Sequence, residues 1–138
     1  RGLGDVYKRQ QKLMGLAAYL MTALERGATV VVDELDAKLH PKLLRYVILL
    51  FKDPEVNKSG AQLIFSSQDV STMRNDVFRR DEIWFVARGE GEASQLWSLA
   101  DIHEANGNLV SKNAAFDKQY LSGRYGADPY LTRIEEWD

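Results

Sequence analysis

The chain has 138 residues, of which 45% are hydrophobic and 28% charged, and its formal net charge is −2. This length suits one globular domain, and so balanced a charge excludes a strong electrostatic preference for nucleic acid or acidic lipid. The absence of cysteine excludes disulfides, iron–sulfur clusters and cysteine-ligated zinc. No apolar run reaches the roughly 18 residues of a transmembrane helix, so we expect a cytoplasmic protein without membrane contact.

The first residues, RGLGDVYKRQ, do not share the apolar periodicity of the segment that follows. They resemble translated adapter sequence at the ends of assembled environmental reads. We therefore expect residues 1–9 to be a non-native or disordered stretch and the natural chain to extend upstream. From Gln10 to Arg26, apolar residues recur at helical spacing and predict an amphipathic helix. Gly27 then stands where a left-handed C-cap is wanted.

The next segments alternate between strand and helix patterns. ATVVV, residues 28–32, is short, β-branched and continuous, which is typical of a strand buried on both faces. A turn, DELDA, follows it. A second helix is predicted from Pro41 to Lys52, because proline suits the first turn and apolar residues form a stripe behind it. AQLIFSS, residues 61–67, predicts a second buried strand, and a short helix should begin in QDVSTMRN.

The second half of the chain predicts a hairpin followed by a tail. DEIWFVARGEGEASQLWSL, residues 81–99, reads as two aromatic-rich strands around the turn RGEG. Residues 103–138 are expected to form an irregular tail with a short helix in NAAFDKQYLSG. For the aromatic side chains we expect core or hairpin packing rather than a base-stacking surface; these are Tyr46, Trp84, Phe85 and Trp97. The run Arg79–Asp81 predicts a solvated charge cluster, with a contact to phosphate or to a partner as the alternative.

The order of elements predicts parallel strands joined by right-handed crossovers, with helices on both sides of the sheet. In such sheets ligands lie beyond the carboxyl ends of the strands. Asp33 and Glu34 follow the first strand, and Gln68 and Asp69 follow the second. If the two strands are neighbours, these two pairs of residues should come together.

An apolar strand that ends in Asp-Glu has the form of a Walker B motif. Burying a carboxylate is costly unless a partner compensates its charge, and a magnesium ion would do so. Asp33 would help to hold Mg²⁺ through its water shell, and Glu34 would polarise the attacking water as a general base. The alternative is that these acids face solvent or cap the next helix.

The run LERGATVVVDELDAKLHPKLLRYVILLFKDPEVNKSGAQLIFSSQD closely resembles the C-terminal half of ABC-type prokaryotic ATPases with an AAA domain. These relate to the overcoming-lysogenisation-defect and abortive-infection ATPases. The resemblance extends over nearly all of residues 10–132, including RRDEIWFVARGEGEASQLWSLADI and YLSGRYGADPYL. It implies an α/β, P-loop NTPase-like (ABC-type) partial domain over residues 10–102, with a parallel sheet flanked by helices and a C-terminal β-hairpin. It also implies the cofactors ATP and Mg²⁺, a homodimer of ATPase heads, a nuclease or DNA partner, and phage defence.

The resemblance assigns roles at the site to five residues and a structural role to His40. Asp33 would be the magnesium residue and Glu34 the catalytic base. Asp36 would lie in the D-loop that crosses the dimer interface, next to the nucleotide. Gln68, with Asp69 beside it, occupies the switch position, so Gln68 would act in catalysis and Asp69 in binding the nucleotide. In the same signature, the residues before the second helix, including His40, would start that helix.

The sequence departs from the family pattern in three places. Gln68 replaces a switch histidine, and an amide cannot take up a proton near pH 7. The ABC signature expected before QKLMGL is missing, and so is any G-x-x-x-x-G-K-[ST] P-loop. We therefore expect this chain alone neither to bind ATP tightly nor to hydrolyse it, whereas its longer parent would do both. Two alternatives stay open: a metal-dependent nuclease of topoisomerase-primase type that uses Asp33, Glu34 and Asp36, and a catalytically dead interaction module.

Overall fold

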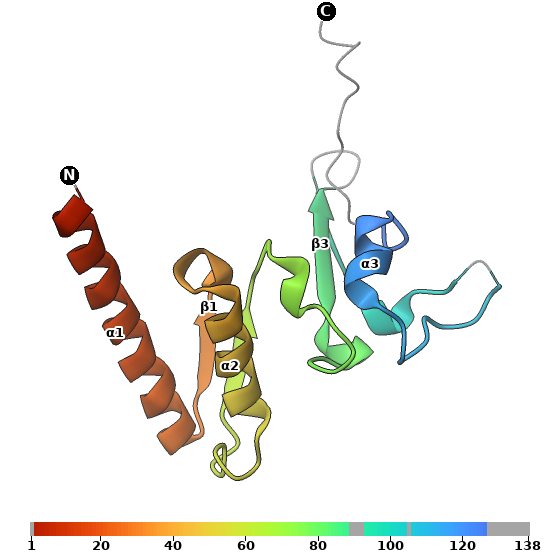
Figure 1. The fold of residues 1–138 in the computed structure, drawn as a ribbon. Helices are drawn as coiled ribbons and strands as arrows, with labels where there is room; N and C mark the ends of the chain where they lie inside the picture. The colour runs from red at the N-terminus through yellow and green to blue at the C-terminus, as the bar shows by residue number, and fades with distance from the viewer. Residues whose placement is uncertain (1, 89–92, 105, 127–138) are drawn as a thin grey trace, which may run out of the picture. The chain divides into compact units, whose positions relative to one another are not determined.

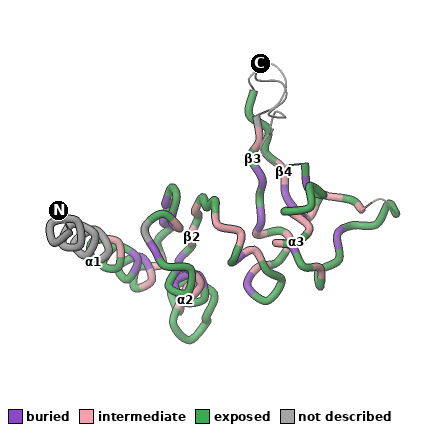
Figure 2. Tube along the Cα trace, turned by 45° about the horizontal axis from the view of Figure 1, so that its top comes forward, coloured by how far each residue is buried: buried purple, intermediate pink, exposed green. Residues whose placement is uncertain are grey.

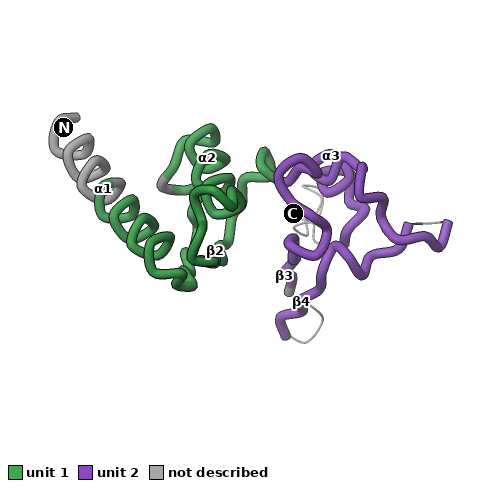
Figure 3. The backbone as a smooth tube through the Cα atoms, turned by 90° about the horizontal axis from the view of Figure 1, so that it is seen from below, with its two compact units in different colours: residues 1–72 green, residues 73–138 purple. Residues whose placement is uncertain are grey.

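The computed structural model of the chain describes residues 2–88, 93–104 and 106–126, which divide into two compact units, residues 1–72 and 73–138 (Figure 3). The first unit contains two helices and two strands, α1 (Gly2–Arg26), β1 (Thr29–Val32), α2 (Pro41–Lys52) and β2 (Gln62–Phe65) (Figure 1). The second contains β3 (Trp84–Arg88), β4 (Ser94–Ser98) and α3 (Phe116–Leu121). This mixed α/β composition, with a small parallel sheet and an antiparallel hairpin, confirms the coarse fold class. The predicted boundaries after residues 9 and 102 stay predictions.

The helix α1 ends in a glycine cap, as the sequence predicts. Gly27 has a φ of 66°, and the amide of Ala28 donates to the carbonyl of Ala23 at 3.0 Å, which is the hydrogen bond of a Schellman motif. The other end differs from the prediction, because helical backbone begins at Gly2 rather than at residue 10. Whether residues 1–9 are foreign to the chain stays a prediction.

The strands β1 and β2 pair in parallel, with Thr29 opposite Gln62 and Val32 opposite Phe65. The helix α2, which connects them, has the predicted bounds and buries Leu44, Val47 and Ile48. His40 is its N-cap, and Nδ1 of the imidazole accepts a hydrogen bond from the amide of Lys42 at 3.2 Å. The predicted helix-starting role of His40 is therefore confirmed.

The parallel pair is buried on one face only, so the prediction of burial on both faces is wrong. Val30 and Val32 are buried, whereas Val31 is 73% exposed and Ile64 is 56% exposed. Figure 2 shows buried and exposed stretches alternating along the chain. Val31 and Ile64 stand opposite each other in the register and therefore share a face. Among the described residues nothing covers that face, and a continuous apolar run cannot by itself tell one covered face from two.

The second unit is organised around the predicted hairpin. β3 and β4 are antiparallel, with Phe85 opposite Trp97, and residues 89–92 of the predicted turn lie outside the described residues. Phe85 is buried in a cluster with Leu99, Phe116 and Tyr125. The Tyr125 ring lies 5.4 Å from that of Phe85, and Trp97 donates from Nε1 to the Tyr125 carbonyl at 3.2 Å. The tail thus contributes Phe116 and Tyr125 to the core, whereas the sequence pattern predicted only an irregular tail with a short helix over residues 103–138.

The aromatic residues differ in how far the packing prediction holds. Phe85 is buried and Trp97 half-buried, as expected, but Trp84 and Tyr46 are exposed, so the prediction is wrong for these two. Alternation along β3 places Trp84 on the opposite face from Phe85. No described helix is long and apolar enough to cross a membrane.

Candidate functional site

The parallel pairing brings the residues after β1 and those after β2 to one edge of the sheet. The backbone ladder continues past both strands, because the amide of Ser66 donates to the Val32 carbonyl at 3.1 Å. The amide of Leu35 in turn donates to the Ser66 carbonyl, also at 3.1 Å. The turn at Asp33 and Glu34 is therefore held against the end of β2, and the predicted convergence of the two strand ends is observed.

Ser66 is the residue that organises this edge, and the sequence reasoning missed it. Its hydroxyl donates to Oδ1 of Asp33 at 2.5 Å and accepts from the amide of Glu34 at 2.7 Å. One side chain thereby fixes both the orientation of the first carboxylate and the backbone of the second acid. The available signal was its position: a hydroxyl directly after the second strand faces the acids that follow a parallel neighbour.

Glu34 has a backbone conformation that L-residues seldom adopt. Its φ is 48° and its ψ is 55°, and it is the one non-glycine residue with positive φ among those that the structure describes. The left-handed region costs a residue with a Cβ about 1 kcal/mol. The Glu34 carboxylate, which is exposed, accepts a hydrogen bond from Nε2 of Gln68 at 3.1 Å. The strained backbone thus directs the acid toward the end of the second strand.

Asp36 joins the same edge from the short helix η1, Leu35–Lys38. Its Oδ2 accepts a hydrogen bond from the backbone amide of Gln68 at 3.3 Å. Its Oδ1 is buried and has no hydrogen-bond partner among the described residues. An unpaired buried carboxylate oxygen is costly, which makes this atom a candidate for a donor or a cation from outside the described chain.

Asp69 does not join the other acids. Its two carboxylate oxygens accept hydrogen bonds from Ser71, one from the amide and one from the hydroxyl, both at 2.8 Å. These bonds start the short helix η2, Val70–Thr72. The edge therefore brings together Asp33, Glu34, Asp36 and Gln68, while the Asp69 carboxylate is used locally.

The burial argument for a metal ion at this edge is wrong, because Asp33 and Glu34 are both exposed and their charges remain solvated. No group of three or more metal-binding side chains occurs among the described residues. Magnesium in nucleotide sites, however, is held by one or two carboxylates together with waters and phosphate oxygens. Asp33, which has a second oxygen beyond its bond to Ser66, is an oxygen donor of the kind that Mg²⁺ prefers.

The AAA-type resemblance is supported over the part of the chain that contains this edge. Residues 10–74 match the sequence model of a family described as "AAA domain, putative AbiEii toxin, Type IV TA system". Comparisons with curated proteins and with solved structures gave no match. The matched segment covers just under half of the chain and includes β1, α2 and β2. Residues 10–74 are therefore similar to an AAA domain, a kind of domain that binds nucleotides.

Proposed function

We propose that the edge formed by Asp33, Glu34, Asp36 and Gln68 is the Walker B side of an ATP-hydrolysing site in an ABC-type ATPase head. The observation that carries the proposal is the hydrogen bond between Gln68 and Glu34, which joins the ends of two parallel neighbouring strands. Ligands of α/β sheets bind beyond such strand ends. The AAA-domain match over the same residues supports nucleotide as the ligand.

Asp33 is the residue proposed to hold Mg²⁺. A bound magnesium ion would compensate the charge of the phosphate oxygens and of the nearby acids. Ser66 restricts Asp33 by donating to Oδ1, so that Oδ2 stays available for a metal-bound water. The residues present fit a magnesium ion by their chemistry, because Asp33 is an oriented carboxylate at an exposed edge that phosphates can approach.

Glu34 is the proposed general base, and Gln68 is its neighbour at the switch position. A carboxylate within hydrogen-bond reach of a water can accept its proton as the water attacks phosphorus. The amide of Gln68 orients that carboxylate and offers a donor for a phosphate oxygen, but it cannot take up a proton. This arrangement favours a role in positioning for Gln68 and leaves proton transfer to Glu34.

Asp36 is proposed to work across an interface between two ATPase heads. Its buried Oδ1 has no partner within the described chain, as expected for an acceptor whose donor comes from a second subunit or from bound nucleotide. Asp69 contributes through η2, which it starts, rather than through a direct contact. The family description, which names a toxin, is consistent with a role in phage defence.

The test uses the proposed longer chain, in which a P-loop would precede this segment. Glu34→Gln should lower the rate of ATP hydrolysis by about 10²–10⁴-fold, the usual contribution of a general base, and leave ATP affinity unchanged. Glu55→Gln, in an exposed loop of the same unit, is the matched control and should keep the parental rate. A Glu34→Gln enzyme with undiminished turnover would refute the assignment.

The present chain alone should bind nucleotide poorly, because the P-loop amides and lysine that grip phosphates are not in this sequence. Calorimetric titration of ATP with Mg²⁺ should give no affinity in the micromolar range. Micromolar binding would show that the edge holds nucleotide without a P-loop, which contradicts the proposed division of labour.

A further inference from the structure

The second unit has a cleft of about 540 Å³ whose lining residues all belong to that unit. It lies between the short helix η3, Arg80–Glu82, and the loop before α3. The polar residues that line it come from both segments and include three cations; they are Asn75, Arg79, Arg80, Asp81, Lys112 and Asn113. Only some of these charges are compensated by acids of the described chain.

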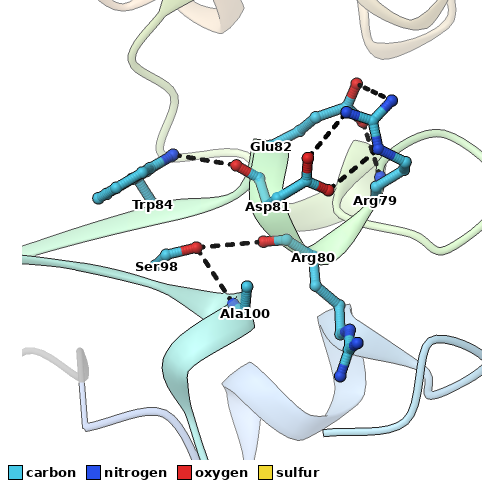
Figure 4. A network of polar contacts seen from close by, with 7 residues as sticks. All are labelled: Arg79, Arg80, Asp81, Glu82, Trp84, Ser98 and Ala100. Carbon is cyan, nitrogen blue, oxygen red and sulfur yellow. Dashed lines mark hydrogen bonds and ion pairs between the residues drawn. The ribbon is translucent and has the colours of Figure 1, made fainter. Parts of the chain in front are cut away.

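Arg79 and Asp81 compensate each other. The guanidinium of Arg79 donates from Nε and Nη2 to the two carboxylate oxygens of Asp81, at 3.0 and 2.8 Å, and Nη1 lies 3.4 Å from Glu82 (Figure 4). The hydrogen bond to Asp81 and the charges of both acids raise the pKa of Arg79. Arg79 is therefore committed to two acids, and these three side chains together carry a net charge of −1 (one cation and two carboxylates).

Arg80 is directed differently, away from those acids (Figure 4). It donates from Nη1 to the main-chain carbonyl of Val110, which is a neutral acceptor. Among the described residues neither Arg80 nor Lys112 has a carboxylate within ion-pair distance. The cleft consequently contains two cations whose charges no described acid balances, one with a planar fork of donors and one with a point charge.

We propose that this cleft binds a phosphate monoester, with Arg80 and Lys112 as the cationic contacts and Asn75 and Asn113 as neutral donors. A phosphate monoester carries a charge of about −1.5 to −2 at pH 7, which matches two cations, whereas a carboxylate carries only one. The guanidinium of Arg80 keeps further N–H donors beyond the one given to Val110, and such donors suit phosphate oxygens.

The size of the cleft favours an esterified phosphate over the free ion. A volume of about 540 Å³ accommodates a phosphate together with the group that it esterifies. Two sources provide this chemistry, a free mononucleotide and the 5′-phosphorylated end of a nucleic-acid strand. The proposal does not depend on the ATPase assignment, because it rests on residues of the second unit alone.

The test is an NMR titration of the full chain with thymidine 5′-monophosphate, a 5′-phosphorylated oligothymidine, and the same oligothymidine without the 5′-phosphate. The phosphorylated ligands should shift the amides of residues 75–81 and 112–113 saturably, with a dissociation constant on the order of 1 mM. An oligonucleotide that binds at least about tenfold more tightly than the mononucleotide identifies a strand end as the source, and equal affinity identifies the mononucleotide.

Lys112→Gln removes one of the two uncompensated charges without breaking any described contact, and it should weaken binding about fivefold. Lys118→Gln, on the exposed surface of α3, is the matched control and should change affinity less than about twofold. Binding that is unaffected by Lys112→Gln, that is equal without the 5′-phosphate, or that shifts only residues 33–36 and 66–68 would overturn the proposal. Glu34→Gln should leave the titration unchanged.

Discussion

Replacing Gly27 by alanine should destabilise the first unit more than an alanine at any ordinary left-handed glycine. Gly27 ends α1 and starts the approach to β1, with a φ of 66°. A Cβ built at this position would lie 2.2 Å from the carbonyl oxygen of Ser59 and 3.1 Å from its carbonyl carbon. Both contacts are with backbone atoms, so relief requires a shift of the loop that precedes β2.

The expected magnitude has two parts. The left-handed conformation costs alanine about 1–2 kcal/mol, and the lower entropy of the unfolded variant returns about 0.4–1 kcal/mol. Displacing the Ser59 backbone adds about 1–3 kcal/mol, the usual cost of forcing atoms into packed structure. Gly27→Ala should therefore cost about 2–4 kcal/mol in total. Gly60→Ala is the matched control, because Gly60 has a φ of 71° but its Cβ would meet nothing within 4 Å.

Urea unfolding followed by circular dichroism at 222 nm measures both variants, and hydrogen exchange of β1 localises the effect to the first unit. Gly60→Ala should cost only the conformational part, about 0.5–1 kcal/mol. If the two variants lose the same stability, the close approach of Ser59 is not what requires glycine at position 27.

Two further predictions concern Glu34 and Tyr125. Glu34→Gly should stabilise the chain by about 0.5 kcal/mol, because relief of the left-handed strain outweighs the added unfolded-state entropy. Glu55→Gly, at a residue without positive φ, should instead destabilise the chain. If urea unfolding shows that both substitutions change the free energy of unfolding in the same direction, the backbone strain at Glu34 is contradicted. Burial, followed by the negative charge of Glu104, raises the pKa of Tyr125 to about 12 from 10.0. The folded state disfavours the phenolate, so the neutral Tyr125 side chain contributes to the free energy of unfolding. This contribution is complete below pH 10 and is lost as the pH rises toward 12, with a loss of about 1.4 kcal/mol at pH 11. Urea unfolding at pH 9 and 11 should show that loss relative to Tyr125→Phe, and equal pH dependence in both proteins would refute it.

The sequence predicts local structure well at positions where a specific physical requirement is met by one residue type. Pro41 and the apolar stripe behind it fix α2, whose bounds are the predicted ones. Gly27 identifies a helix end because glycine alone enters the left-handed region without strain. The side chains on the uncovered face of the sheet could not be predicted in this way. Val31 is β-branched like its buried neighbours, and its exposure depends on which elements cover the sheet.

In the candidate site, too, some contacts could be predicted from the sequence and others could not. That the acids after β1 meet Gln68 after β2 follows from parallel pairing, and the hydrogen bond between Gln68 and Glu34 is observed. The role of Ser66 could not be predicted, because a serine after a strand is common and its two hydrogen bonds depend on the register of the strands. The Asp69 carboxylate was expected near the nucleotide, but its hydrogen bonds to Ser71 are local contacts that compete with a role at the edge.

The acid-bearing edge combines several features that cost folding free energy. Glu34 holds a left-handed backbone that glycine would adopt without strain, and Asp36 has a buried oxygen without a partner among the described residues. Ser66 and Gln68 compensate only part of this, because their hydrogen bonds to Asp33 and Glu34 are exposed and replaceable by water. Strain that no interaction within the fold compensates is expected where side chains are positioned for a ligand. The exposure of Asp33 and Glu34, which removes burial as an argument for magnesium, leaves this uncompensated strain as the stronger physical reason to regard the edge as functional.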